Sequence, residues 1–377
     1  MSDGNDGSPP GPPPEGEPRK TPSSSGYRPS KGFQQELKDA VRPRAALMLL
    51  GVLILELGFV VSYVGAFHAP KPDRIPLAVV APAQARAALI GKLNALPGRP
   101  LSARPADSAS QARARVLDHS VDAALLVSPG RGRNRLLVAS AGGPSGVQAL
   151  QAVFRTVERA HGFTITDLRP PNSEDGRGLG SFYLVVGVII GGYLASAALS
   201  ASYGARPANP HRMYIRLGTL AGLSILSGLG GAIIVDSVFA ALPGHFATLW
   251  AIAVLITFAA AAAGTAFQVL LGPAGIALSV LIFVVLGNPS AGGVIPSALL
   301  PPFWRAIGPA FPNGAGVTLV RNYAYFGGHH TSTAWWVLSG WAAGGVLLSA
   351  AVSYRRQSKF APGAPKNPTA DPPPTTT

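Results

Sequence analysis

Long runs of apolar residues, separated by polar or Pro/Gly-containing segments, dominate the hydrophobic pattern of this chain. An α-helix needs roughly 20 mostly apolar residues to cross the hydrocarbon core of a bilayer. Six candidate runs occupy residues 45–67, 182–201, 217–242, 246–271, 274–286 and 334–352. The run at 274–286 is too short to span alone. The pattern therefore predicts an α-helical, multi-pass membrane protein.

Basic residues near the ends of these runs indicate how the chain is oriented, because cytoplasmic loops of membrane proteins carry an excess of Lys and Arg. Arg42 and Arg44 precede the first run. Arg206, Arg212 and Arg216 lie between the second and third runs, and Arg355, Arg356 and Lys359 follow the last run. The short segment 243–245 carries no Lys, Arg, Asp or Glu. We expect both termini in the cytoplasm and residues 68–181 outside it.

Both ends of the chain are rich in Pro, Gly, Ser and Thr. Such segments bury too little apolar surface to offset the entropy of ordering, so we expect disordered tails at 1–31 and 354–377. Between the first tail and the first run, residues 32–44 place Phe33, Leu37 and Val41 at intervals of four. This spacing predicts an amphipathic helix in the cytoplasmic interface, serving either to lead the chain into the membrane or to dock a partner.

Residues 68–181 combine short apolar strands with helical patterns. Strands are expected at 75–81, 121–127, 135–140 and 163–168, and helices at 83–96, 108–119 and 146–160. Strands interleaved with helices predict a small α/β domain with a mixed sheet. Asp118, His119 and Asp122 lie close together in the sequence but lack the spacing of a metal site or an acid–base pair, so we assign them no chemistry.

Composition narrows the functional classes. The chain of 377 residues is 47% hydrophobic and 13% charged, with a net charge of +14 from 31 Lys and Arg against 17 Asp and Glu. With no Cys, it has no disulfide, thiolate metal site or cysteine nucleophile. The basic charge comes without a nucleic-acid reading motif. We therefore predict neither an enzyme nor a nucleic-acid-binding protein, and we expect no cofactor and no metal.

Two acidic residues fall within the apolar runs, where an ionisable group is costly. Glu56 lies midway along the first run, and Asp236 lies in the outward part of the third. They either bind protons or a cation along a pathway, or make interhelical hydrogen bonds that fix the bundle. Gln268, near the end of the fourth run, is interpreted as a packing hydrogen bond.

After the fifth run the chain becomes rich in helix-breaking residues. Pro289 removes a backbone donor, and the nearby glycines disfavour a helix, so we expect the helix to break here. Residues 288–330 are apolar and aromatic but too interrupted to span. They predict re-entrant or interfacial helices on the outer side, packed against protein or a wet cavity. The motif residues are Asn288, Pro289, Ser290, Gly292, Gly293 and Arg321.

The run Gly287-Asn-Pro-Ser-Ala-Gly-Gly, followed by Leu299-Leu-Pro-Pro-Phe-Trp and Asn313-Gly-Ala-Gly, resembles the ABC-2-type transporter permeases, specifically the YhgE/Pip-like branch. The resemblance covers roughly residues 32–356 and is sharpest at 286–326. It implies a six-helix bundle, over 45–67 and 182–353, with an extracytoplasmic α/β domain inserted between the first and second membrane helices. It also implies a dimer, either homodimeric or heterodimeric, working with a separate ATPase.

We therefore expect the permease subunit of an exporter that moves a hydrophobic or amphiphilic substrate outwards. The chain has no Gly-x-x-x-x-Gly-Lys-Ser/Thr loop and is not the motor. Coupling to the ATPase is assigned to Phe33, Leu37, Arg206, Arg212 and Arg216. The alternatives are a non-transporting envelope protein whose outer domain binds a partner, and an ion-coupled carrier using Glu56 and Asp236. The Ala, Gly, Arg and Pro bias indicates a GC-rich bacterial genome, which places the protein in the bacterial cell membrane.

Overall fold

The computed structural model describes residues 43–128, 132–157, 162–207 and 209–360. The predicted tail at 1–31, nearly all of the predicted amphipathic helix at 32–44 and residues 361–377 lie outside the described residues. The chain divides into two units, Met1–Leu53 and Ile54–Thr377. All contacts described below lie within the second unit.

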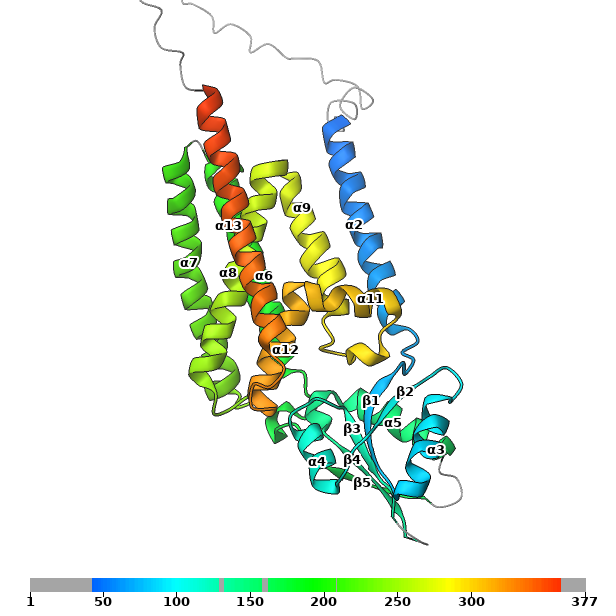
Figure 1. The fold of residues 1–377 in the computed structure, drawn as a ribbon. Helices are drawn as coiled ribbons and strands as arrows, with labels where there is room; N and C mark the ends of the chain where they lie inside the picture. The colour runs from blue at the N-terminus through cyan, green and yellow to red at the C-terminus, as the bar shows by residue number, and fades with distance from the viewer. Residues whose placement is uncertain (1–42, 129–131, 158–161, 208, 361–377) are drawn as a thin grey trace, which may run out of the picture. The chain divides into compact units, whose positions relative to one another are not determined.

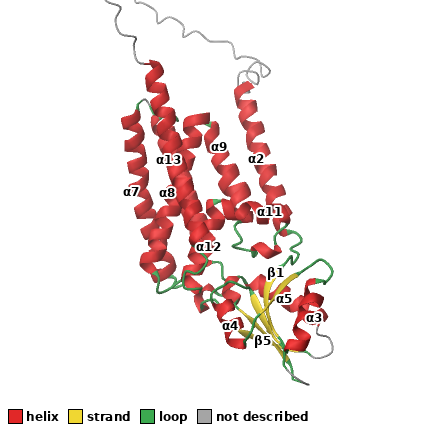
Figure 2. Ribbon diagram, viewed as in Figure 1, coloured by secondary structure: helices red, strands yellow, loops and turns green. Residues whose placement is uncertain are grey.

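Most described residues are helical (Figure 2). The long helices are α2 (Pro43–Phe67), α6 (Gly180–Tyr203), α7 (Pro210–Ala232), α8 (Phe246–Leu271) and α13 (Ser332–Phe360). A π-helical turn, Ile233–Val238, extends α7. In the described part of the chain, five stretches are long and apolar enough to cross a membrane: Leu49–Phe67, Gly180–Tyr203, Pro210–Val238, Phe246–Leu271 and Ser332–Arg355. By length and composition these helices are compatible with the predicted multi-pass membrane protein.

The last helix runs further than the sequence pattern predicts. The pattern assigns residues 354–360 to the C-terminal tail, but α13 continues to Phe360. Arg, Gln and Lys in this stretch are good helix formers, and the first proline after the apolar run is Pro362. The helix therefore extends beyond its apolar part until the sequence stops favouring it.

Helix α8 is the centre of the helical packing, and α6, α7 and α13 all lie against it (Figure 1). Each neighbour presents a glycine at the contact. A Cβ at Gly192, Gly228 or Gly345 would collide with the backbone or side chains of α8. The surface that they meet is rich in alanine, so the backbones approach closely. The small residues in this part of the sequence therefore pack helices together.

The fifth apolar run forms a continuous but short helical stretch, Ala274–Ser290. It consists of α9 (Ala274–Val280), a π-helical turn over Leu281–Gly287, and α10 (Asn288–Ser290). The sequence predicted that this run is too short to span a membrane alone, and the length of the helix agrees. The expected break also agrees with the structure: the helix passes through Pro289 and ends at Ser290, just before the two glycines at 292 and 293. The side chains that make this possible are described below.

Short helices follow this end: α11 (Pro302–Ile307), α12 (Pro312–Tyr325) and 3₁₀ turns at Ser297–Leu299 and Gly308–Ala310. Most of α12 is buried, and it packs on α6, α8 and α13. The prediction required interrupted helices in 288–330 to be packed against protein, and α12 meets this requirement.

A five-stranded mixed sheet lies in the chain between α2 and α6, with strand order β2-β1-β3-β4-β5. The strands are β1 (Ile75–Val80), β2 (Leu101–Pro105), β3 (Ala123–Leu126), β4 (Asn134–Val138) and β5 (Phe163–Asp167). Only the β3–β4 pair is antiparallel. Strand β2 was not predicted from the sequence. It is an edge strand that ends in Arg104 and Pro105, so its apolar alternation is limited to Leu101 and Ala103.

Helices cover both faces of the sheet. One face packs on α3 (Ala83–Asn94) and α5 (Pro144–Val157), and the other packs on α4 (Ala109–Leu117). As predicted, the Ser108 side chain caps α4 by accepting a hydrogen bond from the Gln111 N–H. Leu299 joins the core on the α3/α5 face, and Phe326 joins the core on the α4 face. The segment following the helix end therefore contacts the sheet on both of its faces.

Candidate functional site

The end of the helix at Ser290 is stabilised by hydroxyl groups from α2. A proline at position 289 cannot donate a hydrogen bond, which leaves one carbonyl in the preceding turn without its helical partner. The Ser62 hydroxyl donates to the Val285 carbonyl, and the Tyr63 hydroxyl lies 3.5 Å from the Val284 carbonyl. A side chain of a neighbouring helix thus satisfies the carbonyl that Pro289 leaves free.

Two further side chains complete the cap of this helix. Asn313 of α12 donates through Nδ2 to the Phe283 carbonyl, at 2.9 Å, and to Asn288 Oδ1, at 2.7 Å. The Ser290 hydroxyl donates to the Leu286 carbonyl at 2.7 Å. Buried carbonyls are costly when unpaired, so these bonds explain how the helix can end inside the protein.

Arg321 of α12 binds the loop that follows Ser290, which contains Gly292 and Gly293 and which we call the glycine loop. Its side chain is buried, with 6% of the residue exposed. Its two terminal nitrogens donate to the carbonyls of Gly292 and Gly293, each at 3.0 Å. Gly292 has a φ of +70°, which favours glycine, and a Cβ at Gly293 would collide with Phe182. The structure therefore brings the six predicted motif residues of this region into one cluster with Asn313.

The sheet meets α12 through His119, a residue to which the sequence assigned no chemistry. The His119 ring stacks on Phe326 with centroids 4.1 Å apart. Its Nδ1 donates to Asn322 Oδ1 at 3.0 Å, while the Asn322 amide nitrogen donates to the His329 carbonyl. The other ring nitrogen, Nε2, lies 3.8 Å from Asp122 Oδ1, which is too far for a hydrogen bond.

A cleft of about 570 Å³ opens beside this contact, and we call it the polar cleft. Its charged and titratable lining residues are Asp73, Arg74, His119, Asp122, Arg305, Arg321 and His330. Ala291, Ala298 and Val317 contribute apolar surface. The lining comes from the start of β1, the loop before β3, the glycine loop and α12, so the sheet and the short helices share one cavity.

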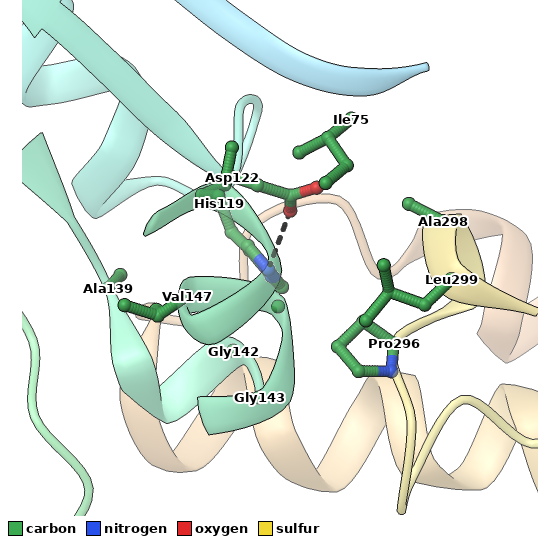
Figure 3. A pocket seen from close by; sticks show the side chains of 12 residues that line it. Ile75, His119, Asp122, Ala139, Gly142, Gly143, Val147, Pro296, Ala298 and Leu299 are labelled. Atoms are coloured by element: carbon green, nitrogen blue, oxygen red, sulfur yellow. Dashed lines mark ion pairs between the residues drawn. The ribbon is translucent and has the colours of Figure 1, made fainter. Parts of the chain in front are cut away.

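A cavity of about 30 Å³, large enough for about a water molecule, adjoins the cleft. Figure 3 shows His119 and Asp122 facing each other on its sheet side, with Pro296 and Leu299 on the opposite wall. A Cβ at Gly146, on α5, would press on Pro296. The wall formed by the loop before Leu299 is therefore tightly fitted to the sheet.

Burial controls the charge of the cleft. It lowers the pKa of His119, although the Asp122 carboxylate and the Asn322 hydrogen bond oppose that shift. It raises the pKa of Asp122, against the opposing effect of His119 and Arg321. It lowers the pKa of Arg321 to about 10, so Arg321 is cationic at neutral pH. At this pH His119 is neutral, and the arginines carry the positive charge of the cleft.

The three arginines assigned to ATPase coupling have different environments. Arg206 donates to the carbonyls of Val269 and Leu270, at the end of α8. Arg216 is buried and donates to the Gly204 carbonyl at 2.7 Å, just after α6. Arg212 is exposed, and its guanidinium has no partner among the described residues. Of these arginines, only Arg212 has a guanidinium without a hydrogen-bond partner among the described residues. Phe33 and Leu37 lie outside the described residues.

The two acids of the apolar runs are not in contact with the polar cleft. Asp236 lies in the π-helical turn after α7 and accepts a hydrogen bond from the His245 N–H at 3.3 Å. Glu56 is exposed on α2, without a hydrogen-bond or ion-pair partner in the described part of the chain. Neither lines the cleft. Gln268 donates to the Ser196 hydroxyl at 3.0 Å, which confirms its predicted packing role.

No family model, curated protein or solved structure matches this chain. The sequence identified the glycine loop and Arg321 but missed Asp73, Arg305 and the His119–Asn322 pair. His119 and Asn322 are separated by 203 positions, and no local spacing indicates that they meet. The available signal was a histidine and an aspartate three positions apart in an apolar surrounding, which is common in structural loops.

Proposed function

We propose that this protein is the permease subunit of an ABC-2-type exporter in a bacterial cell membrane. In this proposal the long helices and the Ala274–Ser290 helix form a six-helix bundle, and the sheet is an extracytoplasmic domain. The permease works as a dimer with a separate ATPase and moves a hydrophobic or amphiphilic substrate outwards.

The helix that ends at Ser290 is the observation that carries the proposal. Non-helical backbone at membrane depth is tolerated where it is buried in protein or lines a cavity, a condition met mainly in transporters and channels. Here Arg321 and Asn313 bury the loop, and the loop borders the polar cleft. A protein that only anchors a domain in the membrane has no need of this costly arrangement.

Arg212 provides the proposed contact with the ATPase. It lies in the first turn of α7, in the basic segment 206–216 that the positive-inside rule assigns to the cytoplasm. Arg206 and Arg216 support this contact by fixing the ends of α8 and α6. The ion-coupled alternative receives less support, because Glu56 and Asp236 do not line the cleft.

The test is affinity purification of the tagged full-length protein from its native membrane in mild detergent, followed by mass spectrometry. We expect a P-loop ATPase at a stoichiometric level, and we expect R212E to lower its recovery. The matched control is R113E, a charge reversal at an exposed arginine on α4. Recovery of the wild type without any ATPase would overturn the proposal and favour the envelope protein that binds a partner.

A further inference from the structure

The buried guanidinium of Arg321 has an unusual electrostatic environment. Its Nε atom is buried and has no hydrogen-bond partner. Its terminal nitrogens bind carbonyls, and no carboxylate lies within ion-pair distance of it among the described residues. The carboxylates of Asp175 and Asp122 act on it only from beyond that distance, and a buried charge without a direct counter-ion is costly. Because Arg321 lines the polar cleft, an anion in the cleft would compensate it.

A second unpaired cation stands at the rim of the cleft. Arg74 is exposed and makes no ion pair in the described part of the chain. Arg305, by contrast, donates to both the carbonyl and the carboxylate of Asp73. Three arginines therefore face two aspartates, Asp73 and Asp122, which leaves a net charge of +1 when the histidines are neutral. The positive charge is concentrated at Arg74 and Arg321.

The start of α12 adds to this positive potential. Gly308, Pro309 and Gly314 line the cleft, and α12 begins at Pro312. The first N–H groups of a helix lack intrahelical acceptors, and the helix dipole favours negative charge at this end. Arg321, Arg74 and the α12 terminus thus converge on one cavity from three parts of the chain.

We infer that the polar cleft binds the phosphate or carboxylate group of an anionic amphiphile. The anion lies between Arg74 and Arg321, where guanidinium groups donate charge-assisted hydrogen bonds to such groups. The apolar part of the ligand lies against Ala291, Ala298 and Val317. As a statement about the transported substrate, this inference rests on the proposed export function. As a statement about binding, it is tested without transport.

The experiment uses the full-length protein in phosphatidylcholine nanodiscs and isothermal titration calorimetry. The probes are dihexanoyl phosphatidic acid, dihexanoyl phosphatidylcholine and inorganic phosphate. We expect phosphatidic acid to bind at least about fivefold more tightly than phosphatidylcholine, because only its headgroup has a net negative charge. Phosphate binding as tightly as phosphatidic acid would identify a free anion as the ligand. Weaker phosphate binding would identify the amphiphile headgroup.

Two opposite charge changes test the location of the site. R74Q removes an exposed guanidinium that makes no hydrogen bond or ion pair in the described part of the chain, and we expect it to weaken phosphatidic acid binding about three- to tenfold. D73N removes the acid that pairs with Arg305, and we expect it to strengthen binding by a similar factor. R113Q, on α4, is the control and should match the wild type.

Equal binding of both lipids, or binding unaffected by R74Q and D73N, would overturn the inference. This result is independent of the ATPase recovered in the purification. If an ATPase is recovered but no anion binds, the export proposal stands and the anion site is rejected. If an anion binds but no ATPase is recovered, the anion site stands and the export proposal is rejected.

Discussion

Arg321 shows at the scale of one residue how charge and structure are combined. Its planar guanidinium donates to two successive carbonyls, an arrangement that a lysine ammonium cannot reproduce. The same group supplies positive charge to the polar cleft. Substitution by lysine keeps the positive charge and removes the paired hydrogen bonds, so it separates the role of Arg321 in the fold from its charge.

We predict that R321K destabilises the protein by about 1–3 kcal/mol, because at least one buried carbonyl loses its partner. R212K, at the exposed arginine in the first turn of α7, should change stability by less than about 0.5 kcal/mol. Thermal unfolding in detergent measures both. Equal unfolding midpoints for the two variants would contradict the account of Arg321.

His119 gives the contact between sheet and helices a pH dependence. Since burial lowers the pKa of His119 below its unfolded value of about 6.5, the unfolded chain takes up the proton first as pH falls. The contribution of neutral His119 to the free energy of unfolding is fully present above pH 6.5. It is lost as pH falls through 6.5 towards the folded pKa. Asp122 acts in the opposite sense, because its folded pKa is raised.

The measurement is therefore made in a D122N background. We predict that D122N loses thermal stability as pH falls from 7.5 to 5.5, and that H119Q/D122N loses less. D122N/H211Q is the control, because His211 is exposed at the start of α7. The explanation fails if the H119Q double variant has the same pH slope as D122N.

At the scale of elements, Pro289 illustrates how a helix tolerates a residue that should end it. The sequence correctly indicated a break in this region. It could not show that the hydroxyl of Ser62, 223 positions away from Val285, takes over a carbonyl and allows the helix to reach Ser290. Propensity is a local property, whereas this carbonyl is satisfied by another helix.

A double-mutant cycle between these positions measures that compensation. S62A alone should destabilise the protein by about 1–3 kcal/mol, because the Val285 carbonyl loses its buried donor. In a P289A background the cost should be smaller, since the alanine that replaces Pro289 supplies a backbone N–H one turn after Val285. We expect a coupling energy of about 0.5–1.5 kcal/mol. Additive effects of the two substitutions would show that Ser62 does not replace the missing helical bond.

At the scale of the whole molecule, the hydrophobic pattern predicted the long helices and most of the strands. Runs such as Phe246–Leu271 and strands such as Ile75–Val80 are specified by local apolar patterning, which is why both were found. The polar cleft was not predictable. Its residues come from the start of β1, the loop before β3 and α12, and they meet only because Leu299 and Phe326 pack on opposite faces of the sheet.

The export proposal requires that the basic loop and the sheet lie on opposite sides of a membrane. The natural chain has no cysteine, so single cysteines can be introduced without removing any. Ala95, at the end of α3, and His211, next to Arg212, are both exposed. A membrane-impermeant maleimide then reports which of the two positions faces the outside of an intact cell.

This accessibility measurement tests the central claim most directly. We predict that A95C is labelled in intact cells and that H211C is labelled only after the membrane is permeabilised. Labelling of both positions in intact cells, or of H211C alone, would contradict the assigned orientation and with it the proposed exporter.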